Sequence, residues 1–164
     1  MRVLLVGFGR LDELYGVADL APHLHVVGID AASDRMKSWA RELKEFPHLR
    51  ALAMDADRMD FEEAYFDAVL AFHTLPFVKE PQAVLGAFAR VLKPGGLFAA
   101  DFAFASTSPN HDGSLLGEKS YLEKSVPFHR HPESNWQSLA EAATWQDSQW
   151  TTTGTRRLWT MHRV

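Results

Sequence analysis

Three groups of residues that could hold a nucleoside-containing ligand follow apolar segments in the first third of the chain. They are Gly7-Phe8-Gly9, Asp30 and Asp55. Glycines let the backbone approach a ligand, and the start of a following helix offers unpaired N–H groups to an anion. An acidic residue about twenty positions beyond such a turn commonly binds both ribose hydroxyls, which suits Asp30. Asp55 could accept a hydrogen bond from an adenine amino group. Together they predict a cofactor site.

Each of these residues also has a structural interpretation, which the sequence leaves open. Gly7 and Gly9 could serve helix–sheet packing, Asp30 could cap the next helix, and Asp55 could occupy a turn. A dinucleotide-binding G-x-G-x-x-G turn would have its third glycine at position 12, where this chain has Asp12. The missing glycine argues against a nicotinamide-dependent reductase, which is the third of the three hypotheses for this chain.

Alternating strand and helix patterns position these residues. Continuous apolar runs are typical of strands buried on both faces. They predict strands over 3–6, 25–29, 49–54, 66–72 and 97–102, with helices after residue 11, over 36–46 behind a Ser33 cap, and from Pro81. Right-handed β–α crossovers then give a parallel sheet with helices on both faces. Ligands of such a doubly wound sheet bind beyond the carboxyl ends of its strands, where the candidates stand.

The regular alternation stops after Asp101. Residues 103–132 show little periodicity and predict a long loop on the substrate side. A last helix near 136–143 and a hairpin of 145–153 with 155–162 would give the sheet an antiparallel end. The Lys93-Pro94-Gly95-Gly96 stretch predicts a helix end and a turn, with Gly95 at positive φ at the helix terminus.

Composition limits the classes of protein. The chain has 164 residues, a net charge of -4 and no cysteine, with 46% hydrophobic residues. This length fits one domain, here 1–164, and the charge gives no basic footprint for nucleic acid. Disulfides and thiolate metal sites are excluded. Because we find neither a membrane-length apolar run nor a signal peptide, we expect a cytoplasmic protein with no membrane partner.

Four motifs in a fixed order occupy residues 54–102. They are Asp55-Ala56, Phe66-Asp67, Glu80-Pro81 and Arg90-Val91-Leu92-Lys93-Pro94-Gly95-Gly96. This order resembles the class I S-adenosylmethionine-dependent methyltransferases, especially the small-molecule, type 11-like branch, over nearly the whole chain. The resemblance implies a Rossmann-like sheet of seven strands, mostly parallel with an antiparallel C-terminal strand. It also implies methyl transfer from S-adenosylmethionine to a small-molecule acceptor, with S-adenosylhomocysteine as product.

The resemblance also implies a set of cofactor-binding residues. Gly7, Phe8 and Gly9 would form the turn beneath the methionine part of the cofactor, and Ala71, Phe72 and His73 would lie beside that part. Asp30 and Ala31 would hold the ribose. Asp55 and Ala56 would hold the adenine.

The chain departs from the family pattern in ways that favour a second hypothesis. Leu5 stands where the family usually has an acid that helps organise the cofactor's amino group, and Leu11 replaces the third glycine. The helices that usually roof the substrate are not in the sequence, which makes a homodimer attractive. The second hypothesis is therefore a non-catalytic binding or partner subunit on the same fold.

Three histidines could serve the acceptor. His73 follows the fourth strand and could act as general base, although a histidine bonded to the backbone is the alternative. His129 and His131 could contact the substrate; without a third ligand we predict no metal site. The aromatic residues Trp136, Trp145, Trp150 and Trp159 are expected to form a cluster or an oligomer contact.

Overall fold

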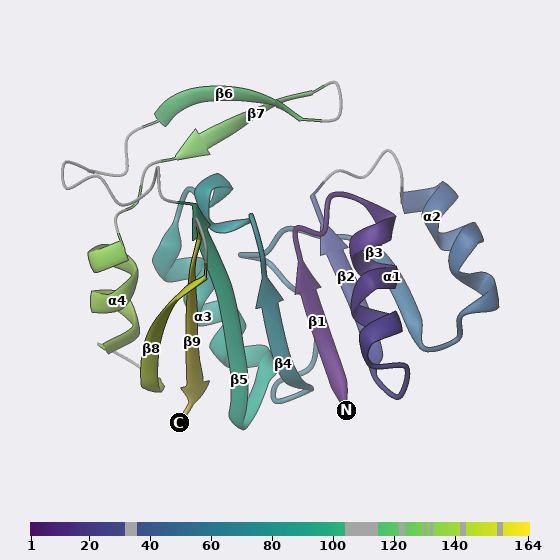
Figure 1. Ribbon diagram of the computed structural model, residues 1–164, viewed down its shortest axis with the longest axis horizontal. Helices are drawn as coiled ribbons and strands as arrows, with labels where there is room; N and C mark the ends of the chain where they lie inside the picture. The colour runs from purple at the N-terminus through teal and green to yellow at the C-terminus, as the bar shows by residue number, and fades with distance from the viewer. Residues whose placement is uncertain are drawn as a thin grey trace.

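A seven-stranded sheet organises the computed structural model, which describes residues 1–31, 36–103, 115–121, 124–129, 131, 133–141, 144–153 and 156–164 (Figure 1). The strand order is β3-β2-β1-β4-β5-β9-β8. The strands are β1 (Arg2–Val6), β2 (His25–Asp30), β3 (Leu49–Ala53), β4 (Phe66–Ala71), β5 (Leu92–Ala103), β8 (Trp145–Thr153) and β9 (Arg156–Arg163). Strands β1 to β5 are parallel, and β9 runs antiparallel to both neighbours. The predicted doubly wound, Rossmann-like sheet is confirmed.

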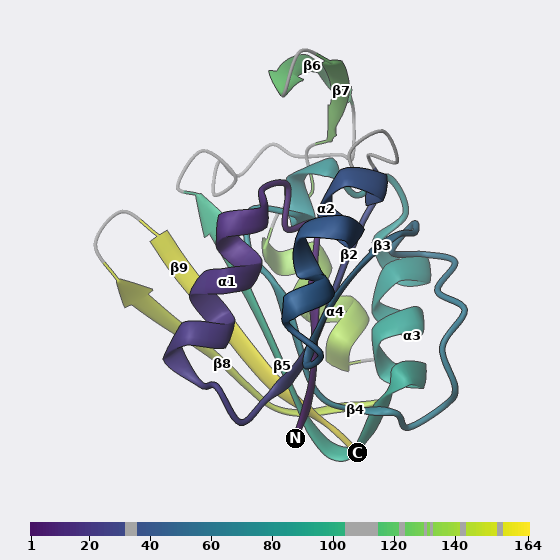
Figure 2. The same cartoon turned by 90° about the vertical axis from the view of Figure 1, so that its right-hand side faces the viewer.

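Helices cover both faces of the sheet (Figure 2). They are α1 (Leu11–Leu20), α2 (Met36–Glu42), α3 (Pro81–Val91) and α4 (Glu133–Glu141), with short 3-10 turns η2 (Leu43–Glu45) and η3 (Leu75–Phe77). Helices α1 and α2 lie on one face, and α3 and α4 on the other. None of the described helices combines the length and the apolar character that a membrane crossing needs.

Two hydrophobic cores follow from the alternation of side chains along each strand. In β1, Leu4 and Val6 pack in the core beneath α3 and α4, while Val3 and Leu5 pack in the core with α1 and α2. Because successive side chains point to opposite faces, one apolar run supplies both cores. This accounts for the continuous, rather than alternating, hydrophobic pattern of the parallel strands.

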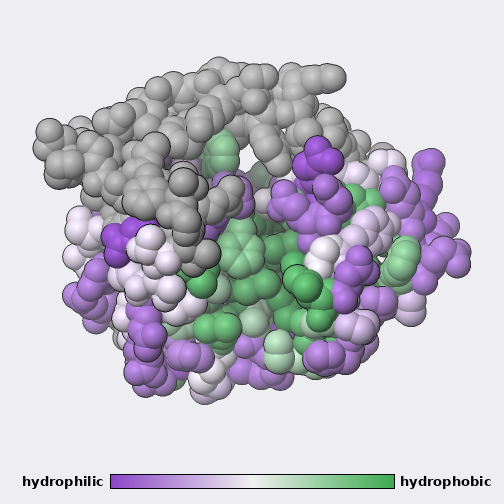
Figure 3. Space-filling model, in the orientation of Figure 1, coloured by the Kyte–Doolittle hydropathy of each residue, from purple (hydrophilic) through white to green (hydrophobic). Residues whose placement is uncertain are grey.

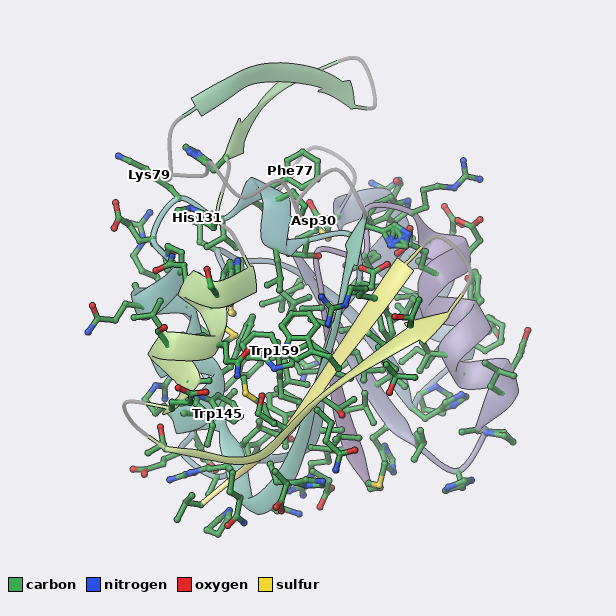
Figure 4. All side chains as sticks on the ribbon, turned by 60° about the vertical axis from the view of Figure 1, so that its left-hand side comes forward. Asp30, Phe77, Lys79, His131, Trp145 and Trp159 are labelled. Carbon is green, nitrogen blue, oxygen red and sulfur yellow. The ribbon has the colours of Figure 1, made fainter. Side chains whose placement is uncertain are left out.

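The predicted aromatic cluster is confirmed, and it lies in the core beneath α3 and α4. Trp159 stacks on Trp150 with ring centroids 5.2 Å apart, and its ring also meets Trp136 and Phe98. The ring centroids of Trp145 and Phe98 are 5.7 Å apart. Figure 4 labels Trp145 and Trp159. The rings fix the antiparallel end of the sheet against α4.

The sheet face on the α1 side is unevenly covered. In the part of the chain that the structure describes, no helix lies on this face over β4, β5, β9 and β8 (Figure 1). Apolar side chains are visible at the centre of the same face (Figure 3). This surface adjoins the carboxyl ends of the strands and therefore bears on the site described below.

The predicted irregular loop over 103–132 is wrong in its second half. Strands β6 (Leu115–Tyr121) and β7 (Lys124–His129) form a separate two-stranded antiparallel sheet. A two-stranded sheet consists of edges alone, so it tolerates Pro127, which argues against a strand in the sequence. Without a strong alternation of apolar residues, such a pair carries little sequence signal.

Gly95 has the predicted positive φ, at +74°, but its predicted place at a helix terminus is wrong. Helix α3 ends at Val91, and Gly95 lies within β5, in an irregularity between the pairs Phe66–Leu92 and Ala68–Leu97. A Cβ added at Gly95 would meet nothing within 4 Å, so backbone conformation alone selects glycine there. The predicted Ser33 cap lies outside the described residues.

Trp159→Ala tests the aromatic cluster. The Trp159 side chain is fully buried, so truncation should lower the free energy of unfolding by about 3–5 kcal/mol. Urea denaturation measures the change. The control is Leu20→Ala, since Leu20 is 88% exposed and its truncation should alter stability by less than about 0.5 kcal/mol. Equal losses in the two variants would contradict the burial argument.

Candidate functional site

The carboxyl ends of the parallel strands bring the candidate residues to one edge of the sheet, the upper edge in Figure 1. From β3 to β5, the strand order gives Asp55, Asp30, the turn Gly7–Gly9, His73 and Asp101 along this edge. The strand order reverses between β1 and β4, which is the position where open α/β sheets bind ligands. An elongated ligand lying across the edge would meet these residues in that sequence.

The glycine turn is built for close approach of backbone. Gly7 and Gly9 have φ of +68° and +56°, in the region that favours glycine. A Cβ added at Gly7 would lie 2.3 Å from Thr74 Oγ1, so the packing interpretation accounts for Gly7. The side chain of Phe8 is buried against the Trp39 ring, which leaves only its backbone to meet a ligand. Leu11 is buried beneath the turn.

Asp30 is joined directly to this turn. The backbone N–H of Gly9 donates a hydrogen bond of 3.0 Å to Asp30 Oδ2. The bond connects two candidates that lie 21 positions apart in sequence and orients the carboxylate of the half-buried Asp30 toward the turn. Ala31, the next residue, is exposed.

The predicted adenine pair lies at the far end of the same edge. Asp55 is exposed, and its Oδ2 accepts a hydrogen bond of 3.1 Å from Arg58 Nη2. Ala56 is partly buried against the core beneath α3. The adenine-binding role of these residues stays a prediction.

His73 has an unusual backbone and a carboxylate partner. Its φ is +58°, a conformation that costs a non-glycine residue about 1–3 kcal/mol and is often found at functional sites. Its backbone N–H donates to Asp101 Oδ1, and its ring Nδ1 lies 3.4 Å from Asp101 Oδ2. The ring is 56% exposed, unlike the partly buried histidine of the alternative interpretation. Ala71, two residues earlier, is fully buried in β4.

Sequence reasoning missed Asp101 as a site residue. It is a buried acidic residue, 7% exposed, in the carboxyl-terminal part of β5. The signal was present, because Asp101 follows the apolar run 97–100 as Asp30 follows its own run. Burial and the contact with His73 make Asp101 the group that positions the imidazole.

A cavity of about 710 Å³ opens between α1 and β9 on the sparsely covered sheet face. Three of its lining residues are ionisable, namely Glu13, His73 and Asp101. The other lining residues are Leu5, Gly16, Val17, Leu20, Phe72 and Leu158. This volume is in the range of small-molecule sites, which typically measure roughly 300–1,000 Å³. The cavity therefore continues the site from the edge of the sheet onto its face.

Glu13, in the first turn of α1, is the second residue that sequence reasoning missed. Its side chain is open to solvent on one side, yet its pKa is raised to about 7, chiefly because neighbouring protein atoms partly desolvate it. The charges of Asp12, Asp30 and Asp101 contribute to this rise in pKa, and Arg10 opposes it. The helical pattern alone makes position 13 look like a solvent-facing residue.

The structure gives His131 a partner away from the glycine turn. Its Nε2 lies 3.0 Å from the Val78 carbonyl oxygen, and its ring packs edge-on against Trp136 at 5.9 Å (Figure 4). Burial lowers the pKa of His131. The His129 ring stacks 6.2 Å from that of His131. The part of the chain that the structure describes has no group of three or more His, Asp or Glu residues that could hold a metal ion.

Comparison with known proteins identifies the family. Residues 4–100 match the family described as "Methyltransferase domain". The chain belongs to this family. The predicted resemblance to class I S-adenosylmethionine-dependent methyltransferases is thus confirmed.

Two curated relatives are methyltransferases of different acceptors. A phosphatidylethanolamine N-methyltransferase from Cereibacter sphaeroides is 33% identical over 99 residues, which cover 58% of this chain and 47% of that protein. A demethylmenaquinone methyltransferase from Renibacterium salmoninarum is 35% identical over 111 residues, covering 66% and 44%. The chain matches about half the length of these relatives.

Solved structures agree on the fold. An S-adenosylmethionine-dependent methyltransferase from Mesorhizobium loti superposes with a TM-score of 0.76 at 14% identity, covering 99% of this chain and 90% of that one. Another from Aquifex aeolicus gives 0.74 at 17% identity, covering 100% and 82%. At these identities the likeness supports the fold alone.

Glu13→Gln should make stability less dependent on pH. The pKa of Glu13 is about 7 in the folded chain against an ordinary 4.5, so the folded state binds more protons between these values. The free energy of unfolding therefore falls as pH rises from about 4.5 to 7 through this group. The free energy of unfolding of the variant, relative to that of the native protein, should therefore rise between pH 4.5 and pH 7. Urea denaturation of both proteins at pH 4.5 and pH 8 measures this difference.

Asp19→Asn, an exposed acid on the same helix, is the control for this comparison. Its stability difference from the native protein should change less between the two pH values. A Glu13→Gln difference that is equal at both pH values would contradict the raised pKa.

Proposed function

We propose that this methyltransferase transfers the methyl group of S-adenosylmethionine to a small-molecule acceptor and releases S-adenosylhomocysteine. One observation carries the proposal: the Gly9–Asp30 and His73–Asp101 contacts flank the point where the strand order reverses. The first pair offers a turn and a carboxylate to a nucleoside. The second offers a base beside a cavity.

The residues at the edge of the sheet fit the cofactor. The strand order favours adenine at Asp55 and Ala56, ribose at Asp30 and Ala31, and the methionine part over Gly7–Gly9 and beside 71–73. Gly7 and Gly9 carry no side chains and Phe8 is buried, so the turn presents its backbone to this part of the cofactor. When bound, the cofactor supplies a methyl group already activated by a sulfonium. The protein must then align the acceptor and exclude water.

His73 is the proposed general base. The ring nitrogen away from Asp101, Nε2, would take the proton of an oxygen or nitrogen acceptor as the methyl group is transferred. The Asp101 carboxylate, beside Nδ1, would hold the ring in one orientation and stabilise its positive charge. Asp101 is thus a positioning residue, and the imidazole is the group that touches the acceptor.

The acceptor is proposed to be a small molecule with an apolar part. The cavity next to His73 is lined by Leu5, Val17, Phe72 and Leu158, which favour apolar groups. The curated relatives are named for phosphatidylethanolamine and demethylmenaquinone, so these two compounds are the acceptors to test first.

Several sequence-based expectations stay predictions. They are substrate contacts by His129 and His131, a single domain over 1–164, a cytoplasmic location, a homodimer, and no nucleic-acid or membrane partner. His131 has a structural role through the Val78 carbonyl, which makes His129 the better candidate for substrate contact.

A second candidate function is a non-catalytic binding or partner subunit. The observation that favours it is Leu5, whose apolar side chain lines the cavity where the family usually has an acid. This candidate would bind the cofactor without methylating any acceptor. The two proposals therefore differ in turnover and not in cofactor binding.

Calorimetric titration with S-adenosylmethionine and S-adenosylhomocysteine tests the cofactor site. We expect micromolar binding by the native chain and a loss of about tenfold or more in Asp30→Ala, equivalent to about 1.4 kcal/mol. The control is Asp60→Ala, an exposed acid outside the predicted site, which should bind as the native chain does. No binding by the native chain at millimolar ligand would contradict the proposal.

His73→Ala and Asp101→Asn test the catalytic pair. His73→Ala should lower turnover by about 100-fold or more, because general base catalysis contributes about 10²–10⁴. Asp101→Asn should lower turnover less, and in both variants the affinity for S-adenosylhomocysteine should fall less than the turnover does. The assay follows labelled methyl transfer to phosphatidylethanolamine vesicles and to demethylmenaquinone in detergent. If the native chain binds cofactor but methylates neither, the non-catalytic candidate is favoured.

A further inference from the structure

The Glu13 carboxylate lines the cavity. No residue that the structure describes forms a hydrogen bond or an ion pair with it, although desolvation disfavours its charge. The nearby cation Arg10 forms an ion pair with Asp12, in which Arg10 Nε lies 2.9 Å from Asp12 Oδ1. A partly desolvated carboxylate of this kind is stabilised by a cationic group, which a ligand can bring.

The charges around Glu13 fit a cationic ligand. Asp12, Asp30 at the end of β2 and Asp101 in β5 all place negative charge near the Glu13 carboxylate, and Arg10 opposes them. Two carboxylates, Glu13 and Asp101, line the cavity, and His73 is its third ionisable lining group. The repulsion between them is relieved when a positive charge binds among them.

The strand order decides which part of the cofactor reaches Glu13. With adenine at β3 and ribose at β2, the amino-acid part extends over β1 and β4, where Glu13 and His73 line the cavity. This part carries the α-ammonium group, and Leu5 from β1 offers it only an apolar surface.

Resting on the proposed function, we propose that the Glu13 carboxylate binds the α-ammonium group of S-adenosylmethionine and supplies the negative charge that Leu5 does not. Glu13 is the third residue of α1, which begins two residues after Gly9, so the helix holds it in a fixed relation to the glycine turn. The assignment makes Glu13 a cofactor-binding residue that acts on the amino acid and not on the nucleoside.

Two ligands separate this role from a general effect on the site. S-adenosylhomocysteine has the α-ammonium but no sulfonium charge, whereas 5′-methylthioadenosine has the same nucleoside and thioether without the amino acid. Calorimetric titration of Glu13→Gln with both, at pH 8, isolates the ammonium contact. We expect S-adenosylhomocysteine to bind about tenfold more weakly than to the native chain, or about 1.4 kcal/mol, with 5′-methylthioadenosine unchanged within about twofold.

Controls keep the outcomes distinct. Asp19→Asn removes an exposed acid from the same helix and should bind both ligands as the native chain does, and thermal unfolding verifies that both variants are folded. Equal weakening of both ligands, or no weakening, in folded Glu13→Gln overturns the ammonium contact while the cofactor site stands. If the native chain binds neither ligand, the proposed function fails, and the Glu13 assignment fails with it.

Discussion

The approach of Thr74 to Gly7 is the contact on which the site depends. The Thr74 hydroxyl lies 2.7 Å from the Val6 carbonyl oxygen and donates a hydrogen bond to it, joining the ends of β1 and β4. A methyl group at Gly7 would lie 2.3 Å from that hydroxyl oxygen, so any larger residue would push the two strand ends apart. The same junction places Gly9 beside Asp30 on one side and His73 on the other. Packing and function are therefore not alternatives at Gly7, because the packing creates the geometry of the site.

Charge is distributed unevenly along the edge that this junction creates. Asp30 and Asp101 each accept a backbone N–H, from Gly9 and His73 respectively, and such bonds stabilise a carboxylate in a partly dry place. Glu13 has no equivalent bond within the described part of the chain. Two of the three acids are thus held by backbone N–H groups, whereas Glu13 is open to a ligand. This difference is the physical basis for assigning Glu13, rather than its neighbours, to a cationic group.

Much of the fold could be predicted because the information is local. An apolar run that supplies two cores marks a parallel strand, and the residue after it marks the edge where ligands bind. By this rule Asp30 and Asp55 were found, and the same rule applied to the run 97–100 would have found Asp101. Glu13 could not be found in this way, since that side of α1 becomes a cavity wall only because none of the described helices covers β5 and β9. The β6–β7 pair was not predicted for another reason, because two edge strands need no alternation of apolar and polar residues.

The departures from the family pattern gain a physical explanation from the cavity. Leu11 is buried beneath the glycine turn, so the loss of the third glycine is absorbed by the core and need not obstruct a ligand. Leu5 is different, because its replacement of an acid removes charge from the lining of the cavity. Helix α1 presents Glu13 to the same cavity, so one acidic group is kept at a new position in the chain. A site that keeps its charge while moving the residue that carries it is more consistent with retained cofactor binding than with a fold that has lost it.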